Sequence, residues 1–295
     1  MRPVPSQRES QLSACVHCGF CLPVCPTYAL WGEEMDSPRG RLHLMKAEAE
    51  GRVPIKTPFV QRMDNCLGCL ACMTACPSGV QYGRLIEGTR AVVEASFDRP
   101  LRDRLFRAML FAVLPYPFRL RLVSAPLAVL TRLRDWFDFG SWLDWFPARV
   151  RALVRLAPER IGNGSALPER TLARGTRRAR VGLLTGCVQR VFFSEVNRAT
   201  ARVLAAEGCE VVAPAEQGCC GALSLHAGRE HEAKAFARRA MAAFERASVD
   251  QIAVNVAGCG SMLKEYGHHW DDDKQAGRQQ FAGKMMNVSE FLDQL

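Results

Sequence analysis

The sequence lacks several features that would place it in common protein classes. It has no run of eighteen consecutive apolar residues, so no segment is expected to cross a membrane as a single helix. The first eleven residues are polar, and no secretory signal is expected there. The chain also has no GxGxxG turn for a dinucleotide, no HExxH motif and no Ser/His/Asp set that argues for hydrolysis. Any chemistry must therefore come from other residues.

Cysteine is abundant instead, and eight of the 13 cysteines fall into two runs with one spacing. The runs are Cys15-x2-Cys18-x2-Cys21-x3-Cys25-Pro26 and Cys66-x2-Cys69-x2-Cys72-x3-Cys76-Pro77. This spacing is typical of bacterial ferredoxins, in which three thiolates of a run bind one [4Fe–4S] cluster and the fourth binds the other. We therefore expect two [4Fe–4S] clusters, one bound by Cys15, Cys18, Cys21 and Cys76, and one by Cys66, Cys69, Cys72 and Cys25.

Two other uses of these cysteines compete with this interpretation. Structural zinc needs four ligands per tetrahedral site, usually as two separated pairs, and two crowded runs offer no natural pairing. Disulfides are disfavoured because 13 is an odd number and residues so close in a tight loop bridge poorly. Zinc remains the main alternative, in a nucleic-acid-binding protein that would use basic charge for phosphates.

The formal net charge of +9 is weak support for nucleic acid. Two four-thiolate clusters of about −2 each would lower it to about +5. The only real basic cluster lies at 174–180, in a stretch rich in Gly, Ser, Pro and Arg that resembles a solvated linker. We expect no nucleic-acid partner.

The pattern of the chain predicts an α+β protein in three parts. Residues 1–100 form a mostly helical ferredoxin-type domain, residues 101–179 a helical connector and linker, and residues 180–295 an α/β domain with a mostly parallel sheet. In the connector, prolines at 115, 117, 126 and 147 are expected to break the helices. These segments are either amphipathic helices that pack on the first domain or, because of Trp136, Trp142 and Trp145 and the nearby arginines, a docking surface for a partner or a membrane.

Cysteines also follow each strand predicted for the α/β domain, at 181–185, 209–213 and 251–255. The cysteines are Cys187, Cys219, Cys220 and Cys259. Because parallel strands end at one edge of a sheet, we expect these four thiols to converge there as a third thiol or cluster site, with His226 nearby. Vicinal Cys219 and Cys220 are also plausible redox thiols, and plain burial is the remaining alternative. Cys209 begins a strand and is expected in the core.

These motifs together resemble the heterodisulfide-reductase and glycolate-oxidase iron–sulfur family, which joins a ferredoxin-like module to two cysteine-rich CCG domains. The resemblance is carried by Cys18-Gly19-Phe20-Cys21-Leu22-Pro23, Asn65-Cys66-Leu67-Gly68-Cys69, Gly186-Cys187-Val188-Gln189, Gly218-Cys219-Cys220-Gly221-Ala222-Leu223, His226-Ala227-Gly228, Gly258-Cys259-Gly260 and Lys264-Glu265-Tyr266-Gly267. Two departures stand out. The family pattern ends in CxxC where this chain has Cys259 and Met262, and the sequence stops at Leu295, where a second CCG domain would follow.

The resemblance implies an electron-transfer subunit of a 2-hydroxy-acid dehydrogenase complex. Its partner would be a FAD-containing subunit, and a quinone or membrane acceptor would take the electrons. Alternatives within the family are a glycerol-3-phosphate or lactate dehydrogenase complex, or thiol redox chemistry like that of heterodisulfide reductase. Because thiolates must stay reduced until loaded, we expect the cytoplasm, with peripheral attachment at the inner face of the cell membrane as a variant.

Overall fold

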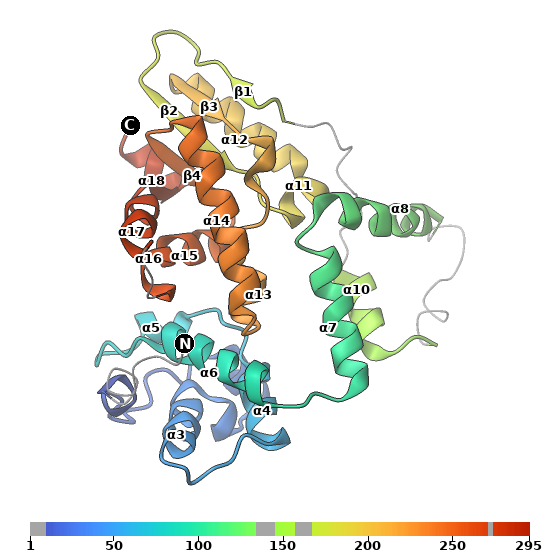
Figure 1. Ribbon diagram of the computed structural model, residues 1–295, viewed down its shortest axis with the longest axis vertical. Coiled ribbons are helices and arrows are strands. Elements are labelled where there is room, and N and C mark those ends of the chain that lie inside the picture. Colours follow the sequence, from blue (N-terminus) through green and yellow to red (C-terminus); the bar gives the residue numbers. More distant parts are fainter. Residues whose placement is uncertain (1–9, 134–144, 157–166, 271–273) are drawn as a thin grey trace. The chain divides into compact units, whose positions relative to one another are not determined.

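The computed structural model describes residues 10–133, 145–156, 167–270 and 274–295 (Figure 1). The chain divides into one unit of Met1–Leu101 with Ala222–Lys234, and a second unit of Arg102–Gly221 with Ala235–Leu295. Helices dominate, and one five-stranded, mostly parallel sheet lies in the second unit. The predicted α+β class is therefore confirmed, whereas the boundaries at 100 and 179 stay a prediction.

The first unit is built from short helices that surround the cysteine runs. They are α2 (Pro26–Trp31), the 3₁₀ turn η1 (Glu34–Asp36), α3 (Pro38–Ala49), α4 (Thr57–Asn65), α5 (Ala71–Thr74), α6 (Tyr82–Ser96) and α13 (Ala222–His226). Ser37 caps α3 by accepting a hydrogen bond from the Gly40 N–H, and Pro38 occupies the first turn, where a missing N–H is harmless. At Gly40 a Cβ atom would lie 1.9 Å from the Glu34 carbonyl oxygen, so only glycine lets α3 pack this closely on η1.

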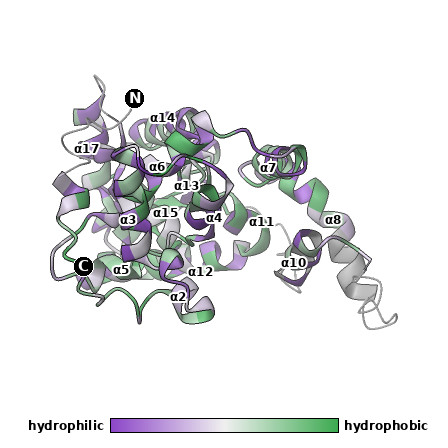
Figure 2. Cartoon of the chain, turned by 90° about the horizontal axis from the view of Figure 1, so that it is seen from below, coloured by the Kyte–Doolittle hydropathy of each residue, from purple (hydrophilic) through white to green (hydrophobic). Residues whose placement is uncertain are grey.

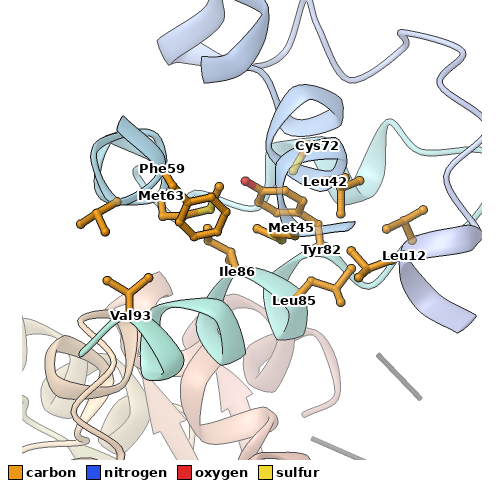
Figure 3. Close-up of a cluster of buried hydrophobic side chains, with 12 residues drawn as sticks. Leu12, Leu42, Met45, Phe59, Met63, Cys72, Tyr82, Leu85, Ile86 and Val93 are labelled. Carbon is orange, nitrogen blue, oxygen red and sulfur yellow. The ribbon is translucent and has the colours of Figure 1, made fainter. Parts of the chain in front are cut away.

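One side of α6 packs on α3 and α4 to form the core of this unit (Figure 3). The buried residues are Leu12, Leu42, Met45, Phe59, Val60, Met63, Cys72, Val80, Tyr82, Leu85, Ile86 and Val93. Cys72 belongs to this cluster, and Cys15, Cys21, Cys66 and Cys76 pack against it. The apolar core therefore fixes the loops that carry the cysteine runs.

The sheet of the second unit has the strand order β1-β3-β2-β4-β5. The strands are β1 (Arg170–Thr171), β2 (Ala179–Leu184), β3 (Cys209–Val212), β4 (Gln251–Val254) and β5 (Met285–Asn287). β1 runs antiparallel to β3, and the other neighbours are parallel. The three strands predicted from sequence are present, while the edge strands β1 and β5 are additions.

Helices cover both faces of this sheet, as parallel sheets require. On one face Val181 and Leu183 share a core with α12 (Ser194–Ala206) and with Phe291 of α18 (Val288–Asp293). On the other face α14 (Glu230–Ala247) lies so close that a Cβ atom at Gly182 would be 2.9 Å from the Phe244 ring. The remaining helices of this region are α11 (Val188–Phe192), α15 (Ala257–Lys264), α16 (Tyr266–His269) and α17 (Gln275–Gly283), with the 3₁₀ turn η2 (Ala215–Gln217).

The connector contributes α7 (Leu101–Val113), α8 (Pro117–Leu133) and α10 (Ala148–Leu156). Along α7 and α10, hydrophilic and hydrophobic residues are interspersed (Figure 2). The expected break at Pro126 is wrong, because α8 continues through it; a proline removes one helical hydrogen bond and can bend a helix without ending it. Trp136 and Trp142 lie outside the described residues, and Trp145 is 92% exposed.

No single helix in the described ranges is long and apolar enough to cross a bilayer. By length and composition alone, α7 taken together with Pro117–Pro126 passes the same test, although the two segments are bent by 110°.

Candidate metal centres and thiol cluster

A first cavity of the amino-terminal unit is lined by three cysteines of the first run and the last cysteine of the second run. These are Cys15, Cys18, Cys21 and Cys76, with Cys72 and Tyr82 also on its wall. Gly19 and Gly68, in the two cysteine loops, have φ values of 87° and 65°, which allow such tight coiling. Because Cys76 and Cys72 come from the second run, the first run alone does not enclose this cavity.

A second cavity has the complementary composition. It is lined by Cys66, Cys69 and Cys72 of the second run and by Cys25 of the first. Cys25 reaches it as the residue that caps α2, directly before Pro26. Each cavity thus contains the last cysteine of the other run, and Cys72 and Tyr82 are on the walls of both cavities. The two sets of four cluster ligands stay a prediction.

The donor set of each cavity fits an iron–sulfur cluster. Five cysteines line the first cavity and four line the second, with Cys72 on both walls, so each offers at least the four thiol ligands of a [4Fe–4S] cluster. Within the described part of the chain, no three His, Cys, Asp or Glu side chains converge closely enough to hold one metal ion. Four sulfurs spread around a cavity suit a polynuclear cluster better than a single tetrahedral zinc ion.

Burial keeps part of this thiol set neutral when no metal is bound. It raises the pKa of Cys72 to about 12, and the neighbouring Cys66 adds to the rise. Burial also raises the pKa of Cys21. A metal centre offsets this cost, because coordination deprotonates a thiol outright.

Polar groups of the first unit surround the second cavity. The Tyr82 hydroxyl donates to the Cys66 sulfur at 3.5 Å, and the Thr27 hydroxyl lies 3.2 Å from the Cys25 sulfur. Behind Thr27, buried Arg41 pairs with buried Asp36 at 3.0 Å. On the other side, Arg90 donates to the backbone carbonyls of Met63 and Cys66. Sequence reasoning missed all these residues, since none of them belongs to a cysteine motif.

The four thiols of the second unit also come together, in two pairs. The Cys219 and Cys187 sulfurs are 3.5 Å apart, and the Cys220 and Cys259 sulfurs are 3.0 Å apart. Cys187 follows β2, the vicinal pair follows β3 and η2, and Cys259 lies on α15 after β4. The convergence expected at the carboxyl ends of the strands is therefore present. Cys209 is fully buried in the sheet core, as predicted.

Two of these thiols, Cys187 and Cys219, are held in their neutral form. A hydrogen bond with Cys219, together with burial, raises the pKa of Cys187. At Cys219 the hydrogen bond with Cys187 lowers the pKa, but the hydrogen bond with Cys220 and burial outweigh it and raise the pKa to about 12. Buried thiols of raised pKa are poor nucleophiles, so thiol–disulfide chemistry is disfavoured without a bound metal.

His226, expected near these thiols, belongs to the first unit. Its ring lies 2.8 Å from the Glu87 carboxylate, and its carbonyl accepts from Arg90, all within that unit. It therefore takes part in packing α13 on α6, and a place near the four thiols stays a prediction. The missed neighbour is Tyr266, whose buried hydroxyl donates to the Cys220 carbonyl. Met262, 2% exposed, fills the place where the family pattern has its last cysteine.

Comparison with known proteins finds one family match over the two cysteine runs and another over the four paired thiols. Residues 11–80 match a 4Fe-4S dicluster domain, and residues 181–264 match a cysteine-rich domain of the CCG type. No solved structure matches significantly.

Among curated relatives, the probable glycolate oxidase iron–sulfur subunit of Bacillus subtilis is 35% identical over 97% of this chain. The glycolate oxidase iron–sulfur subunit of Escherichia coli is 37% identical over 97% of this chain. This chain spans 66% and 64% of the lengths of these two relatives. Lactate utilization protein A of Geobacillus kaustophilus is 35% identical, over 38% of this chain and 47% of its own length. The chain is thus a homologue of glycolate oxidase iron–sulfur subunits, with a 4Fe-4S dicluster domain followed by a cysteine-rich domain.

Proposed function

We propose that this chain is the electron-transfer iron–sulfur subunit of a flavin-dependent glycolate (2-hydroxy acid) dehydrogenase complex. The names of the two relatives that match 97% of this chain support its membership of such a complex, and the dicluster domain supports the electron-transfer role. The observation that carries the proposal is the pair of cavities, each lined by cysteines drawn from both runs.

The ligand sets follow those cavities. Cys15, Cys18, Cys21 and Cys76 would hold one [4Fe–4S] cluster, and Cys66, Cys69, Cys72 and Cys25 the other. Such clusters accept and release single electrons when bound. The protein's part is to shield them with apolar core and to direct N–H and O–H groups toward sulfur, which tunes their potential.

Oxidation of the substrate would belong to a partner. Taking two electrons from an alcohol carbon needs a hydride acceptor, which flavin or nicotinamide normally supplies. We therefore assign that step to a FAD-containing subunit and give this chain the onward transfer toward quinone. Exposed apolar side chains at Leu101, Leu105 and Met109 of α7 and at Phe118 and Leu122 of α8 support docking on that subunit or on the inner face of the cell membrane, from the cytoplasm.

A reconstitution assay tests this role. Purified, iron-loaded chain mixed with glycolate and an artificial dye is expected to give no turnover until the flavoprotein subunit is added. Loaded chain that reduces the dye with glycolate and without flavin would show the role to be misassigned. The second candidate function is electron transfer in a lactate dehydrogenase complex, which the match to lactate utilization protein A favours. Replacing glycolate by lactate in the complete mixture tests it.

A further inference from the structure

Two hydroxyl groups are directed at sulfurs of the second cavity. The Tyr82 hydroxyl is 3.5 Å from the Cys66 sulfur and the Thr27 hydroxyl is 3.2 Å from the Cys25 sulfur. Both residues are 4% exposed, so water does not compete for these contacts. Since a metal-bound thiolate can only accept hydrogen bonds, both hydroxyls would act as donors once the site is loaded.

The Thr27 hydroxyl is polarised from behind by a buried cation. Two N–H groups of Arg41 donate to Thr27 Oγ1 at 3.2 Å each, so the oxygen is engaged as an acceptor. The single hydroxyl proton can then go to the Cys25 sulfur or to the Asp36 carbonyl oxygen, 2.8 Å away. A thiolate is the charged acceptor of the two, and hydrogen bonds to charged groups are the stronger ones.

The ion pairs behind this hydroxyl leave an excess of positive charge. Asp36 is the single carboxylate between the guanidinium groups of Arg41 and Arg62, which sums to +1. Arg41 and Asp36 are each 1% exposed, so solvent screens this charge poorly. Arg41 is also on the wall of the second cavity.

The first cavity has a different electrostatic setting. Arg39 on its wall is matched by one carboxylate, Glu34, through contacts of 2.6 and 3.2 Å, and this pair sums to zero. The donors described for its sulfurs are backbone N–H groups, those of Arg39 and Cys21 toward the Cys21 sulfur. Positive charge and hydroxyl donors are therefore concentrated at the second cavity.

We propose that the Thr27 and Tyr82 hydroxyls, with the Arg41 guanidinium behind Thr27, raise the reduction potential of the centre at Cys25, Cys66, Cys69 and Cys72 above that of the centre at Cys15, Cys18, Cys21 and Cys76. One-electron reduction changes the charge of a four-thiolate cluster from about −2 to about −3, and donors and positive charge stabilise the more negative state. An electron shared between the two centres then resides on the second. The inference rests on the proposed ligand sets.

Redox titration of the iron-loaded full chain, followed by electron paramagnetic resonance with dithionite as reductant, tests this. Thr27→Val removes the hydroxyl at nearly constant volume and is expected to shift one of the two reduction waves to lower potential. Thr27→Ser, which keeps the hydroxyl, is expected to restore it. Tyr82→Phe is expected to shift the same wave downward. Thr89→Val is the matched control, because buried Thr89 donates instead to the Leu85 carbonyl and both waves are expected to stay in place.

The outcomes separate cleanly. Iron-replete Thr27→Val and Tyr82→Phe proteins with both wild-type potentials would overturn the proposal, as would a downward shift confined to the wave that Cys76→Ser abolishes. If Thr27→Val does not load iron, Tyr82→Phe alone decides. The titration needs neither substrate nor flavoprotein, so its failure is distinct from a failure of the dehydrogenase assay.

Discussion

Cys25 and Cys76 are the residues that join the two cysteine runs. Each lines the cavity of the other run, and each is followed by a proline. Substitution of either cysteine is therefore expected to affect a different centre from substitution of the other three cysteines in its run. Removing either should damage the distant centre and spare the near one.

Serine at either position tests the crossing. Cys25→Ser is expected to disrupt the centre at Cys66, Cys69 and Cys72, and Cys76→Ser the centre at Cys15, Cys18 and Cys21, because an alcohol is a poor replacement for a thiolate on iron. Each variant should lose up to about half of the iron, measured by metal analysis and by loss of one paramagnetic signal. Cys209→Ala is the control, since this core cysteine lines neither cavity. Loss of the near centre in either serine variant would contradict the crossed assignment.

At this scale the sequence is informative about ligands and poor about their surroundings. The cysteine spacing predicts which thiols share a cavity because cluster geometry constrains a short loop directly. Thr27, Arg41 and Tyr82 carry no comparable pattern. Their contacts with the sulfurs depend on how α2, α3 and α6 pack, and packing is set by the whole core.

At the scale of elements, β3 holds the edge strand β1 through one carboxylate. Glu210 is 3% exposed at its side chain and contacts Arg170 of β1 at 2.8 Å and Arg177 at 2.9 Å. The hydrogen bond from Arg177 lowers the pKa of Glu210, and Arg170 adds to this effect. β1 has only two residues, so these ion pairs supplement a short run of backbone pairing with β3.

Glu210→Gln is expected to destabilise the sheet edge by about 1–3 kcal/mol near neutral pH, because the charge-assisted bonds are lost. A lowered folded-state pKa contributes stability above the unfolded pKa, and this is lost as pH falls through the folded one. The difference in Tm between wild type and variant should therefore shrink below about pH 4. Exposed Glu245 provides the control, since Glu245→Gln should leave Tm nearly unchanged. A pH-independent difference would show that charge is not the cause.

Elements were predicted best where burial is complete. The strands at 181–185, 209–213 and 251–255 are nearly continuous apolar runs and appear in the structure with bounds that differ by at most two residues. The segment 223–247, whose sequence pattern is that of one helix, is divided in the structure into α13 and α14, with Gly228 in the break at a φ of 82°. β1 and β5 were missed because strands of two or three residues show no periodicity.

For the whole molecule, cysteine chemistry is divided between the two units. The first holds both cysteine-lined cavities, and the second holds the paired thiols Cys187–Cys219 and Cys220–Cys259. The pairs lack a fifth thiol at position 262, where the side chain is a buried methionine. Because a thioether is a weaker ligand than a thiolate, stable iron binding is expected in the first unit and not in the second.

Counting iron per full chain tests that division. Anaerobically loaded protein should contain about eight irons, from two four-iron centres, and absorb broadly near ~400 nm. Cys219→Ser and Cys259→Ser should leave this number unchanged. Met262→Cys places a thiol one helical turn after Cys259 on α15, on the same face, and is expected to raise the count. About twelve irons in the wild type, falling on Cys219→Ser, would show instead that the cysteine-rich domain binds a centre of its own without the last cysteine of the family pattern.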